Sequence, residues 1–280
     1  MSERYYWPCN ETHDALPQTA ELSGDEAHHL TRVMRQKCGD LVTLFDGAGR
    51  EFRAEITDLR KDRVVLRILE TRLVDAEPQR RVTIAVSLPK GDRQKWLVEK
   101  LTELGCHRLI PLQTERGVAQ CSDQVLERLR RWVMEATKQC KRTRLMRISP
   151  EQTIGEMQSA ECRMQSVRTA AGNVSDRFNG VELGLIAHPR REQCDPQFDG
   201  TFGQWDLPHL MQYLGTLADA SCSETPLPKN VLALVGPEGG FTGREVEQAV
   251  TLGFQPLDLG PRILRVETAA MMLTAILVNS

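Results

Sequence analysis

The pattern of hydrophobic and polar residues changes character near residue 75. Over residues 40–70 apolar and polar positions alternate, which is typical of strands with one buried face. Beyond residue 80, continuous apolar runs alternate with segments of helical period. The polar segment VDAEPQR, residues 74–80, separates the two patterns. We therefore predict two domains, 1–75 and 76–280.

The first domain is expected to be a small β-rich unit. Asp46-Gly47 predicts a hairpin turn, and residues 59–62 predict a second turn between strands. Short strands joined by tight turns over some 50 residues favour a small barrel. A short helix is expected within HHLTRVMRQKCGD (28–40), where Leu30, Val33 and Met34 share a face.

The second domain follows a strand–helix–strand rhythm, which predicts a parallel sheet with helices on its faces. Residues 148–180 carry no clear pattern, and the polar segment 190–228 is long enough to contain a short helix. Strands are predicted over 81–88, 108–113, 181–189, 230–235 and 254–260, and helices over 92–105, over 123–140, from Thr242, and from Glu267 or Thr268 to the C-terminus.

Composition narrows the class of protein. The chain has 280 residues, of which 40% are hydrophobic, so it can bury a sizeable core. No apolar run reaches the roughly 18 residues of a membrane span, and the N-terminus lacks the pattern of a secretion signal. We therefore expect a cytoplasmic protein without a membrane partner. The eight cysteines form no C-x-x-C pair and the six histidines are scattered, so no metal site is predicted.

Charge is distributed unevenly, although the formal net charge is only −2. Residues 76–147 contain 16 Lys/Arg against 8 Asp/Glu, whereas the flanking segments are acidic. Within 128–147, eight basic residues stand against Glu135 alone. A solvated helix face and a surface for a polyanion such as RNA or DNA are both consistent with this run.

A glycine-rich turn, GPEGGF (236–241), follows the apolar strand 230–235. Thr242 and Glu245 form a capping box that begins a helix, so the turn lies at the carboxyl end of a strand, where α/β sheets bind ligands. No phosphate-loop lysine follows, the glycine spacing does not match a dinucleotide fingerprint, and Glu238 disfavours a phosphate. A neutral or cationic ligand and a bare tight turn remain as interpretations.

A second loop of the same kind follows one predicted strand later. Gly260-Pro261 forms a turn after 254–260, and the loop carries Arg262, Arg265 and Glu267 before the last helix begins. Arginines in a loop are often surface charge. Two of them beside a second glycine turn indicate a functional site.

Together, LVGPEGGFTGREVEQA (234–249) and LGPRILRVETAA (259–270) resemble the bacterial 16S ribosomal RNA uracil-N3 methyltransferases, a family of the SPOUT class. Further stretches are similar to that family, in chain order: HHLTRVMRQKCGD, LFDGAG, residues 88–118, EATKQCKRTR and IAHP. The resemblance implies a trefoil-knotted α/β catalytic domain preceded by a PUA-like β-barrel.

The resemblance also implies the activity: transfer of a methyl group from S-adenosylmethionine to N3 of a uridine in 16S rRNA, acting on the assembled small subunit. An arginine would stabilise the deprotonated imide, with Arg265 the first candidate, Arg262 the second, and Glu267 an orienting or proton-accepting group. The cofactor residues implied are Leu234, Val235, Gly236, Pro237, Glu238, Gly239, Gly240, Leu259, Gly260, Ile263, Leu264, Arg265, Thr268 and Ala269.

The implied partner is RNA, and a homodimer is expected because the last helix is apolar on nearly every side. Two other functions stay open: a SPOUT methyltransferase for another base or a ribose, and a non-catalytic RNA-binding module of ribosome assembly. A nucleotide hydrolase is disfavoured by the missing lysine. The candidate RNA contacts are Arg32, Arg35, Lys90, Arg116, Arg142 and Arg144.

Overall fold

A computed structural model describes residues 4–9, 17–60, 62–74, 76–158, 181–188, 205–218 and 228–279. The chain forms two compact units: Met1–Glu77 with Val133–Leu145, and Pro78–Trp132 with Met146–Ser280. The domains predicted from sequence, 1–75 and 76–280, stay a prediction. The compact units differ from them in grouping Val133–Leu145 with the N-terminal residues.

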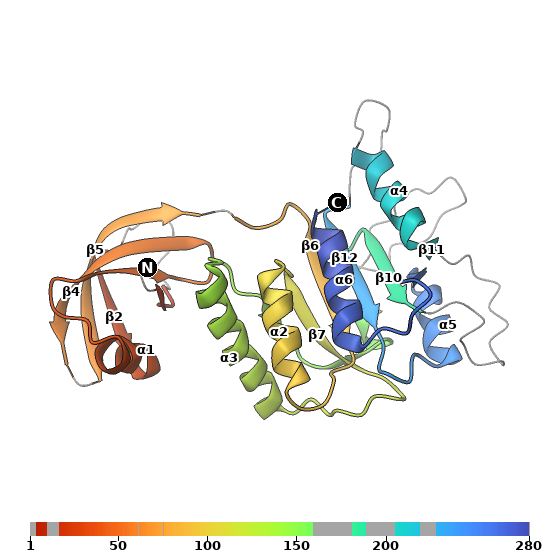
Figure 1. Cartoon of the computed structure of the whole chain (residues 1–280), viewed down its shortest axis with the longest axis horizontal. Coiled ribbons are helices and arrows are strands. Elements are labelled where there is room, and N and C mark those ends of the chain that lie inside the picture. The colour runs from red at the N-terminus through yellow and green to blue at the C-terminus, as the bar shows by residue number, and fades with distance from the viewer. Residues whose placement is uncertain are drawn as a thin grey trace. The chain divides into compact units, whose positions relative to one another are not determined.

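The N-terminal unit is built on one five-stranded sheet, with strand order β1-β3-β4-β5-β2. Figure 1 labels its strands β2, β4 and β5. Its core combines sheet residues such as Leu44, Phe52 and Leu66 with Leu30 from the helical segment. The elements are β1 (Arg4–Tyr6), β2 (Thr19–Ser23), the helix α1 (Gly24–His28), a π-helical turn (His29–Val33), β3 (Leu41–Phe45), β4 (Arg50–Leu59) and β5 (Arg63–Leu73).

Both predicted turns of this unit are confirmed. At the first, Asp46 Oδ1 accepts hydrogen bonds from the backbone N–H of Ala48 (2.8 Å) and Arg50 (3.0 Å), and Gly47 has φ +73°. The left-handed conformation at Gly47 is one that glycine adopts without strain. At the second, the N–H of Arg60 donates to the carbonyl of Arg63 at 2.8 Å, directly between β4 and β5.

The predicted helix over 28–40 is wrong in its bounds and in its buried face. Helical structure begins at Gly24 and ends at Val33. The last turn is π-helical: the N–H of Met34 donates to the carbonyl of His29, five residues back. This wider turn breaks the 3.6-residue period, so Leu30 is buried whereas the side chain of Val33 is exposed.

The C-terminal unit contains a sheet of order β11-β13-β10-β12-β6-β7-β8, whose pairings are all parallel, with β9 paired to β7. Its elements are β6 (Arg81–Val86), α2 (Arg93–Glu103), β7 (Arg108–Gln113), α3 (Asp123–Cys140), β8 (Arg147–Ile148), β9 (Gln152–Thr153), a 3-10 turn (Glu156–Gln158), β10 (Leu183–Ala187), β11 (Trp205–Asp206), α4 (Leu207–Ala218), β12 (Asn230–Val235), α5 (Gly243–Thr251), β13 (Gln255–Asp258) and α6 (Val266–Asn279). The helix α3 has residues in both units.

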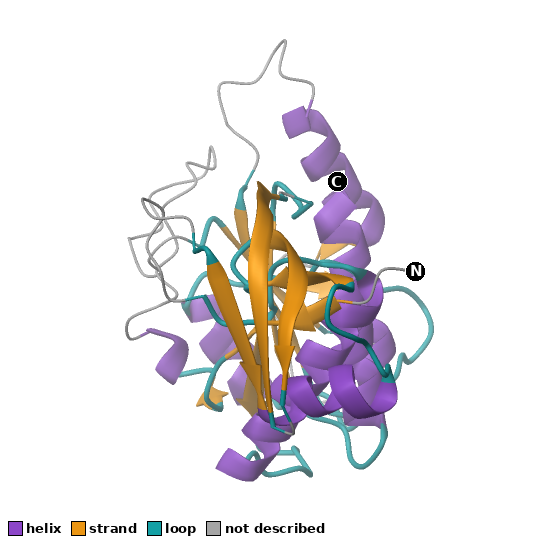
Figure 2. Ribbon diagram, turned by 90° about the vertical axis from the view of Figure 1, so that its left-hand side faces the viewer, coloured by secondary structure: helices purple, strands orange, loops and turns teal. Residues whose placement is uncertain are grey.

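Helices cover both faces of this sheet (Figure 2). α6 packs against β6 and β12 and against α2, which lies beside it (Figure 1). On the other face, α5 buries Val246 and Ala249 against Leu232 and Leu234 of β12, and Leu252, directly after α5, packs in the same cluster. Alternate residues of β12 point to opposite faces, so the continuous apolar run of this strand serves two helical layers.

The α/β architecture expected from the sequence is therefore confirmed, and each predicted strand of the second domain is present. Segment 190–228 contains the helix α4, and segment 148–180 contributes β8, β9 and a 3-10 turn, with 159–180 outside the described residues. The trefoil knot stays a prediction. No helix in the described part of the chain is long and apolar enough to cross a membrane.

Candidate functional site

Three parallel strands end together at one edge of the C-terminal sheet. Ala187 of β10 pairs in register with Val235 of β12 on one side and with Leu257 of β13 on the other. The two glycine loops predicted from the sequence follow β12 and β13, and β10 lies between these two strands. A cavity of about 210 Å³ opens where the three loops meet.

The glycine loop after β12 forms one wall of this cavity. The N–H of Gly240 donates to the carbonyl of Pro237 at 2.9 Å, and Gly240 has φ +70°, so residues 237–240 form a tight turn. A Cβ at Gly236 would lie 3.0 Å from the ring of Phe241, closer than side chains pack. The sequence needs glycine at both positions, for two different reasons.

The loop after β13 forms the facing wall. Gly260 has φ +111°, and its N–H donates to Oδ1 of Asp258 at 3.0 Å. Asp258 is only 2% exposed, so its carboxylate is held beneath the loop. Ile263 follows with 84% of its surface exposed, which is unusual for a large apolar side chain. The wall thus combines backbone polar groups with apolar side chains, as binding sites for flat, mostly apolar ligands do.

A brace connects the glycine loop to the loop after β7. The predicted capping box is present: the Thr242 side chain accepts from the Glu245 N–H, and the Glu245 carboxylate accepts from the Thr242 N–H at 2.7 Å. The other oxygen of Glu245 accepts from the N–H of Glu115 at 2.9 Å. Arg116 Nη1 donates to the carbonyl of Gly239, also at 2.9 Å. These bonds fix the glycine loop on a rigid helix start.

Charged side chains gather at the mouth of the site. Arg93, at the start of α2, forms an ion pair with Glu238 of the glycine loop. This hydrogen bond and charge hold the pKa of the Glu238 carboxyl below its usual value, and the nearby charge of Arg265 contributes in the same direction. Arg93, Glu238 and Arg265 line a second, open hollow together with Ile263 and Leu264.

The structure places most of the predicted cofactor residues around the main cavity. Three of them do not line it: Leu234 is fully buried in the sheet, Thr268 is exposed on α6, and Arg265 lines the second hollow. The predicted residues that do line the main cavity are Val235, Gly236, Pro237, Glu238, Gly239, Gly240, Leu259, Gly260, Ile263, Leu264 and Ala269, and Arg262 joins them.

Glu267, predicted as an orienting or proton-accepting group, is 5% exposed and lies in the first turn of α6. It lines neither hollow. Its Oε2 makes no hydrogen bond with the described residues, and its charge raises the pKa of Arg93 after the larger effect of Glu238. The role predicted for Glu267 therefore stays a prediction.

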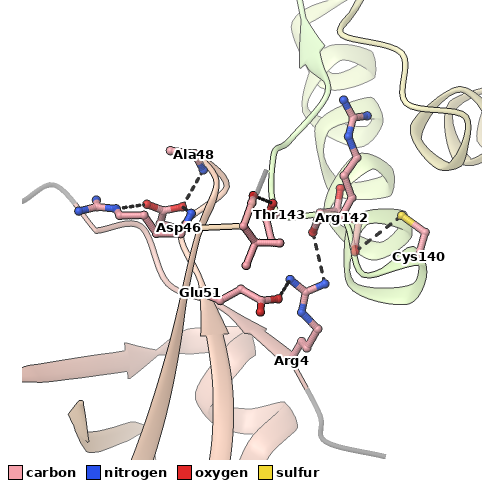
Figure 3. Close-up of polar contacts among 10 residues, drawn as sticks. Arg4, Asp46, Ala48, Glu51, Cys140, Arg142 and Thr143 are labelled. Carbon is pink, nitrogen blue, oxygen red and sulfur yellow. Dashed lines mark hydrogen bonds and ion pairs between the residues drawn. The ribbon is translucent and has the colours of Figure 1, made fainter. Parts of the chain in front are cut away.

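The predicted RNA contacts fall into different environments. Arg32, Arg35, Lys90 and Arg144 are exposed, whereas Arg116 lines the main cavity. Arg142 is only 8% exposed: its guanidinium forms two hydrogen bonds with the carboxylate of Glu77, and its carbonyl accepts from Arg4 (Figure 3). The guanidinium of Arg142 is therefore buried against Glu77, which contradicts its prediction as an RNA contact.

The sequence interpretation missed several residues of the site, among them His188, Asp258 and Arg93. His188 lines the cavity directly after β10, and burial lowers the pKa of its imidazole. Its signal was its place at the end of a predicted strand. Arg93 carried no local signal, because its partner Glu238 is 145 residues away in the sequence. Asp258 supports the turn at Gly260, two residues further on, and the sequence interpretation did not consider that contact. In the described part of the chain, no group of His, Cys, Asp and Glu is arranged to hold a metal ion.

Comparison with known proteins adds to this geometry. An RNA methyltransferase domain model matches residues 76–193 and 210–278, and an RNA methyltransferase PUA domain model matches 22–69.

Similar full-length proteins include ribosomal RNA small subunit methyltransferase E of Bacillus subtilis, 30% identical over 96% of this chain and 93% of that protein. The protein of the same name from Synechocystis sp. is 32% identical over 91% of this chain and 71% of its own. Among solved structures, ribosomal RNA small subunit methyltransferase E from Neisseria gonorrhoeae, bound to S-adenosyl methionine, has a TM-score of 0.72 at 26% identity, covering 98% of this chain and 96% of that one.

Proposed function

The chain belongs to the ribosomal RNA small subunit methyltransferase E family, and on that premise we propose that it transfers a methyl group from S-adenosylmethionine to N3 of a uridine in 16S rRNA. The observation that carries the proposal is the cavity between the loops that follow β10, β12 and β13. Its two glycine loops present backbone polar groups beside apolar side chains, a surface suited to a nucleoside.

The cavity fits the cofactor in its chemistry. Ile263, Leu264 and Ala269 would cover the apolar faces of the adenine ring, while backbone groups of the glycine loop would bind its polar edge. A Cβ at Gly240 or Gly260 would meet no atom within 4 Å, so these glycines border open space where a ligand can approach the backbone. Among the described residues, no lysine lines the cavity, so it lacks the lysine of a P-loop phosphate site.

S-adenosylmethionine supplies an electrophilic methyl group, so the protein has to orient the uracil and lower the cost of removing its N3 proton. The resulting negative charge spreads over O2 and O4. Arg265 lies at the mouth of the cavity, in the hollow that also contains Arg93, and would stabilise this charge. Arg262 lines the cavity itself and is the second candidate.

The target base must be unpaired or flipped out, because N3 lies on the Watson–Crick edge. The N-terminal PUA domain and the exposed arginines would supply contacts to RNA phosphates. Arg32 and Arg35 lie on and just after the π-helical turn, and Arg144 follows α3. The relatives are named as methyltransferases of small subunit ribosomal RNA, and we propose the assembled small subunit as the substrate of this chain.

We also propose a homodimer. α6 buries Ala270, Leu273 and Leu277, while Met272 and Ile276 on another side are only half-buried. This partly uncovered apolar stripe is a surface that a second copy would cover. Light scattering at micromolar concentration should give a dimer mass; a monomer would overturn this part of the proposal.

Calorimetry with S-adenosylmethionine tests the cofactor site. We expect saturable binding of one cofactor per chain, lost when a bulky residue fills the cavity, as in Ala269→Trp. Far-UV circular dichroism should show that this variant folds. If the wild-type chain does not bind the cofactor, a non-catalytic RNA-binding module would explain the fold better than a methyltransferase.

Replacing Arg265 by alanine tests the catalytic part. We expect the methylation rate to fall about 100-fold with cofactor affinity little changed, since the removed charge acts on the developing anion. Full methylation by this variant would exclude the proposed role of Arg265.

A further inference from the structure

The second hollow contains three charged groups beside the cofactor cavity. It is lined by Arg93 from the start of α2, by Glu238 from the glycine loop, and by Ile263, Leu264 and Arg265 from the loop after β13. Glu238, Ile263 and Leu264 line both hollows. A ligand in the second hollow would therefore lie next to whatever occupies the first.

The three charged groups form a pattern of hydrogen-bonding capacity. An arginine only donates and an ionised carboxylate only accepts, so the hollow offers two donors and one acceptor. Glu238 is paired with Arg93 and is also influenced by the charge of Arg265. The pKa of Glu238 is held below its usual value by Arg93, so its carboxylate is ionised at neutral pH. The apolar side chains of Ile263 and Leu264 complete the hollow with a surface on which a flat ring can lie.

We propose that this hollow binds the imide edge of the uracil to be methylated, an inference that rests on the proposed function. The edge presents O4, N3–H and O2, which is acceptor, donor and acceptor. It is the complement of two guanidinium groups and one carboxylate that interacts with both. In the complex before reaction, Glu238 accepts the N3 hydrogen bond, and Arg93 and Arg265 donate to the two carbonyl oxygens. Because the methyl group takes the position of that hydrogen, N3 must lose its proton and Glu238 must move aside before methyl transfer.

The same arrangement selects against cytosine. Cytosine presents an amino group, an unprotonated N3 and O2, so its amino group would face an arginine and its N3 lone pair would face the Glu238 carboxylate. Two unfavourable pairs replace two favourable ones, and a site with unpaired polar groups rejects the wrong ligand strongly. A uracil already methylated at N3 has lost the hydrogen that Glu238 binds, which favours release of the product.

The ion pair between Arg93 and Glu238 does not prevent this binding. The two side chains are 37% and 61% exposed, and surface ion pairs contribute little net stability. Their contact can therefore open at small cost when a ligand offers hydrogen bonds to both. In the free protein the pair keeps both groups at the mouth of the hollow, which reduces the ordering needed on binding.

A purely structural role is the competing explanation: the pair would connect α2 to the glycine loop and act only on cofactor binding. The variant Arg93→Ala separates the two, because Arg93 lines the second hollow and not the first. Lys95→Ala is the matched control. It removes one positive charge from the same helix, at a surface ion pair with Glu99 outside both hollows.

The first experiment measures binding without turnover. Saturation-transfer NMR is recorded with uridine, cytidine and 3-methyluridine, each added to the full chain preloaded with S-adenosylhomocysteine. We expect transfer to uridine and much less to the other two, loss of the uridine signal in Arg93→Ala, and no change in Lys95→Ala. Glu238→Gln should lose discrimination against cytidine, because the amide can donate to an unprotonated N3. Equal transfer to uridine and cytidine, or no transfer to uridine, would overturn the proposal.

The second experiment measures methylation of small subunits that lack the modification, together with calorimetry for S-adenosylmethionine. Arg93→Ala should lower kcat/KM ten- to a hundredfold, while cofactor affinity stays within about threefold of wild type. A variant that methylates normally, or whose whole defect is lost cofactor affinity, would overturn the base-binding role. If instead the wild-type chain forms no 3-methyluridine, the proposed function itself fails, whatever the variants do.

Discussion

Arg116 Nη1 donates a hydrogen bond to the carbonyl oxygen of Gly239 at 2.9 Å, joining the loop after β7 to the glycine loop after β12. The same two segments are joined again where Glu245 accepts from the N–H of Glu115. The orientation of the peptide groups that face the cavity is thus set from outside the glycine loop, and the effects of several substitutions follow from it.

Replacing Arg116 by alanine should weaken S-adenosylmethionine binding about fivefold, because the Gly239 carbonyl loses a charge-assisted donor that fixes its orientation. Arg116 was predicted from sequence as an RNA contact, and a loss confined to RNA affinity would support that role instead. Calorimetry for the cofactor and a filter-binding assay for RNA measure the two effects separately.

A side chain at Gly240, the glycine of the loop with left-handed backbone conformation, should lower the stability of the fold. Gly240 has φ +70°, so Gly240→Ala should destabilise the fold by about 1 kcal/mol and lower cofactor affinity. Gly239→Ala is the control, because the backbone of Gly239 does not have a positive φ and its Cβ would make an ordinary 3.4 Å contact with Arg116. Urea unfolding and calorimetry check both. Equal losses in the two variants would contradict the explanation by backbone conformation.

Replacing Arg142 or Arg144 by alanine should have different effects: the first should lower the free energy of unfolding, and the second should mainly change RNA affinity. Arg142→Ala leaves the mostly buried carboxylate of Glu77 without its partner and should cost about 3 kcal/mol of unfolding free energy. Arg144→Ala removes the same charge from an exposed position, with little effect on stability.

Arg144→Ala should instead affect RNA binding. If Arg144 contacts a phosphate, the slope of log affinity against log salt concentration should become about one unit smaller in this variant. Affinity measured at several salt concentrations decides this. An Arg144 variant with an unchanged slope would remove that residue from the RNA surface.

His188 should give the fold a pH dependence of a defined sign. Burial lowers the pKa of its imidazole below the usual 6.5, so the unfolded chain binds the proton more readily than the folded chain. The stabilisation is complete above pH 6.5 and is lost as pH falls through the lowered value. Urea unfolding between pH 8 and pH 5 should show a loss that is smaller in His188→Asn. An identical loss in that variant would assign the effect to other groups.

Local features of the fold were predictable because their causes are local. The turn at Asp46 and the capping box of Thr242 and Glu245 depend on residues within a few positions of each other, and both are present. The continuous apolar run 230–235 likewise predicted β12.

What could not be predicted depends on pairings distant in sequence. No pattern in the sequence predicts that β10 lies between β12 and β13. The cavity depends on this arrangement, because residues that follow all three strands line it. Arg142 looked like a surface charge because Glu77, its partner, is 65 residues away. The π-helical turn that exposes Val33 departs from the period on which the prediction relied.

The central claim, methylation of uridine N3 in 16S rRNA, is tested most directly by mass spectrometry of the nucleosides of 16S rRNA. A strain deleted for this chain, and the same strain complemented with the wild type or with Arg265→Ala, provide the RNA. We predict that 3-methyluridine disappears on deletion and returns with the wild-type chain but not with the variant. Unchanged 3-methyluridine after deletion, or loss of a different methylated nucleoside in its place, would contradict the claim.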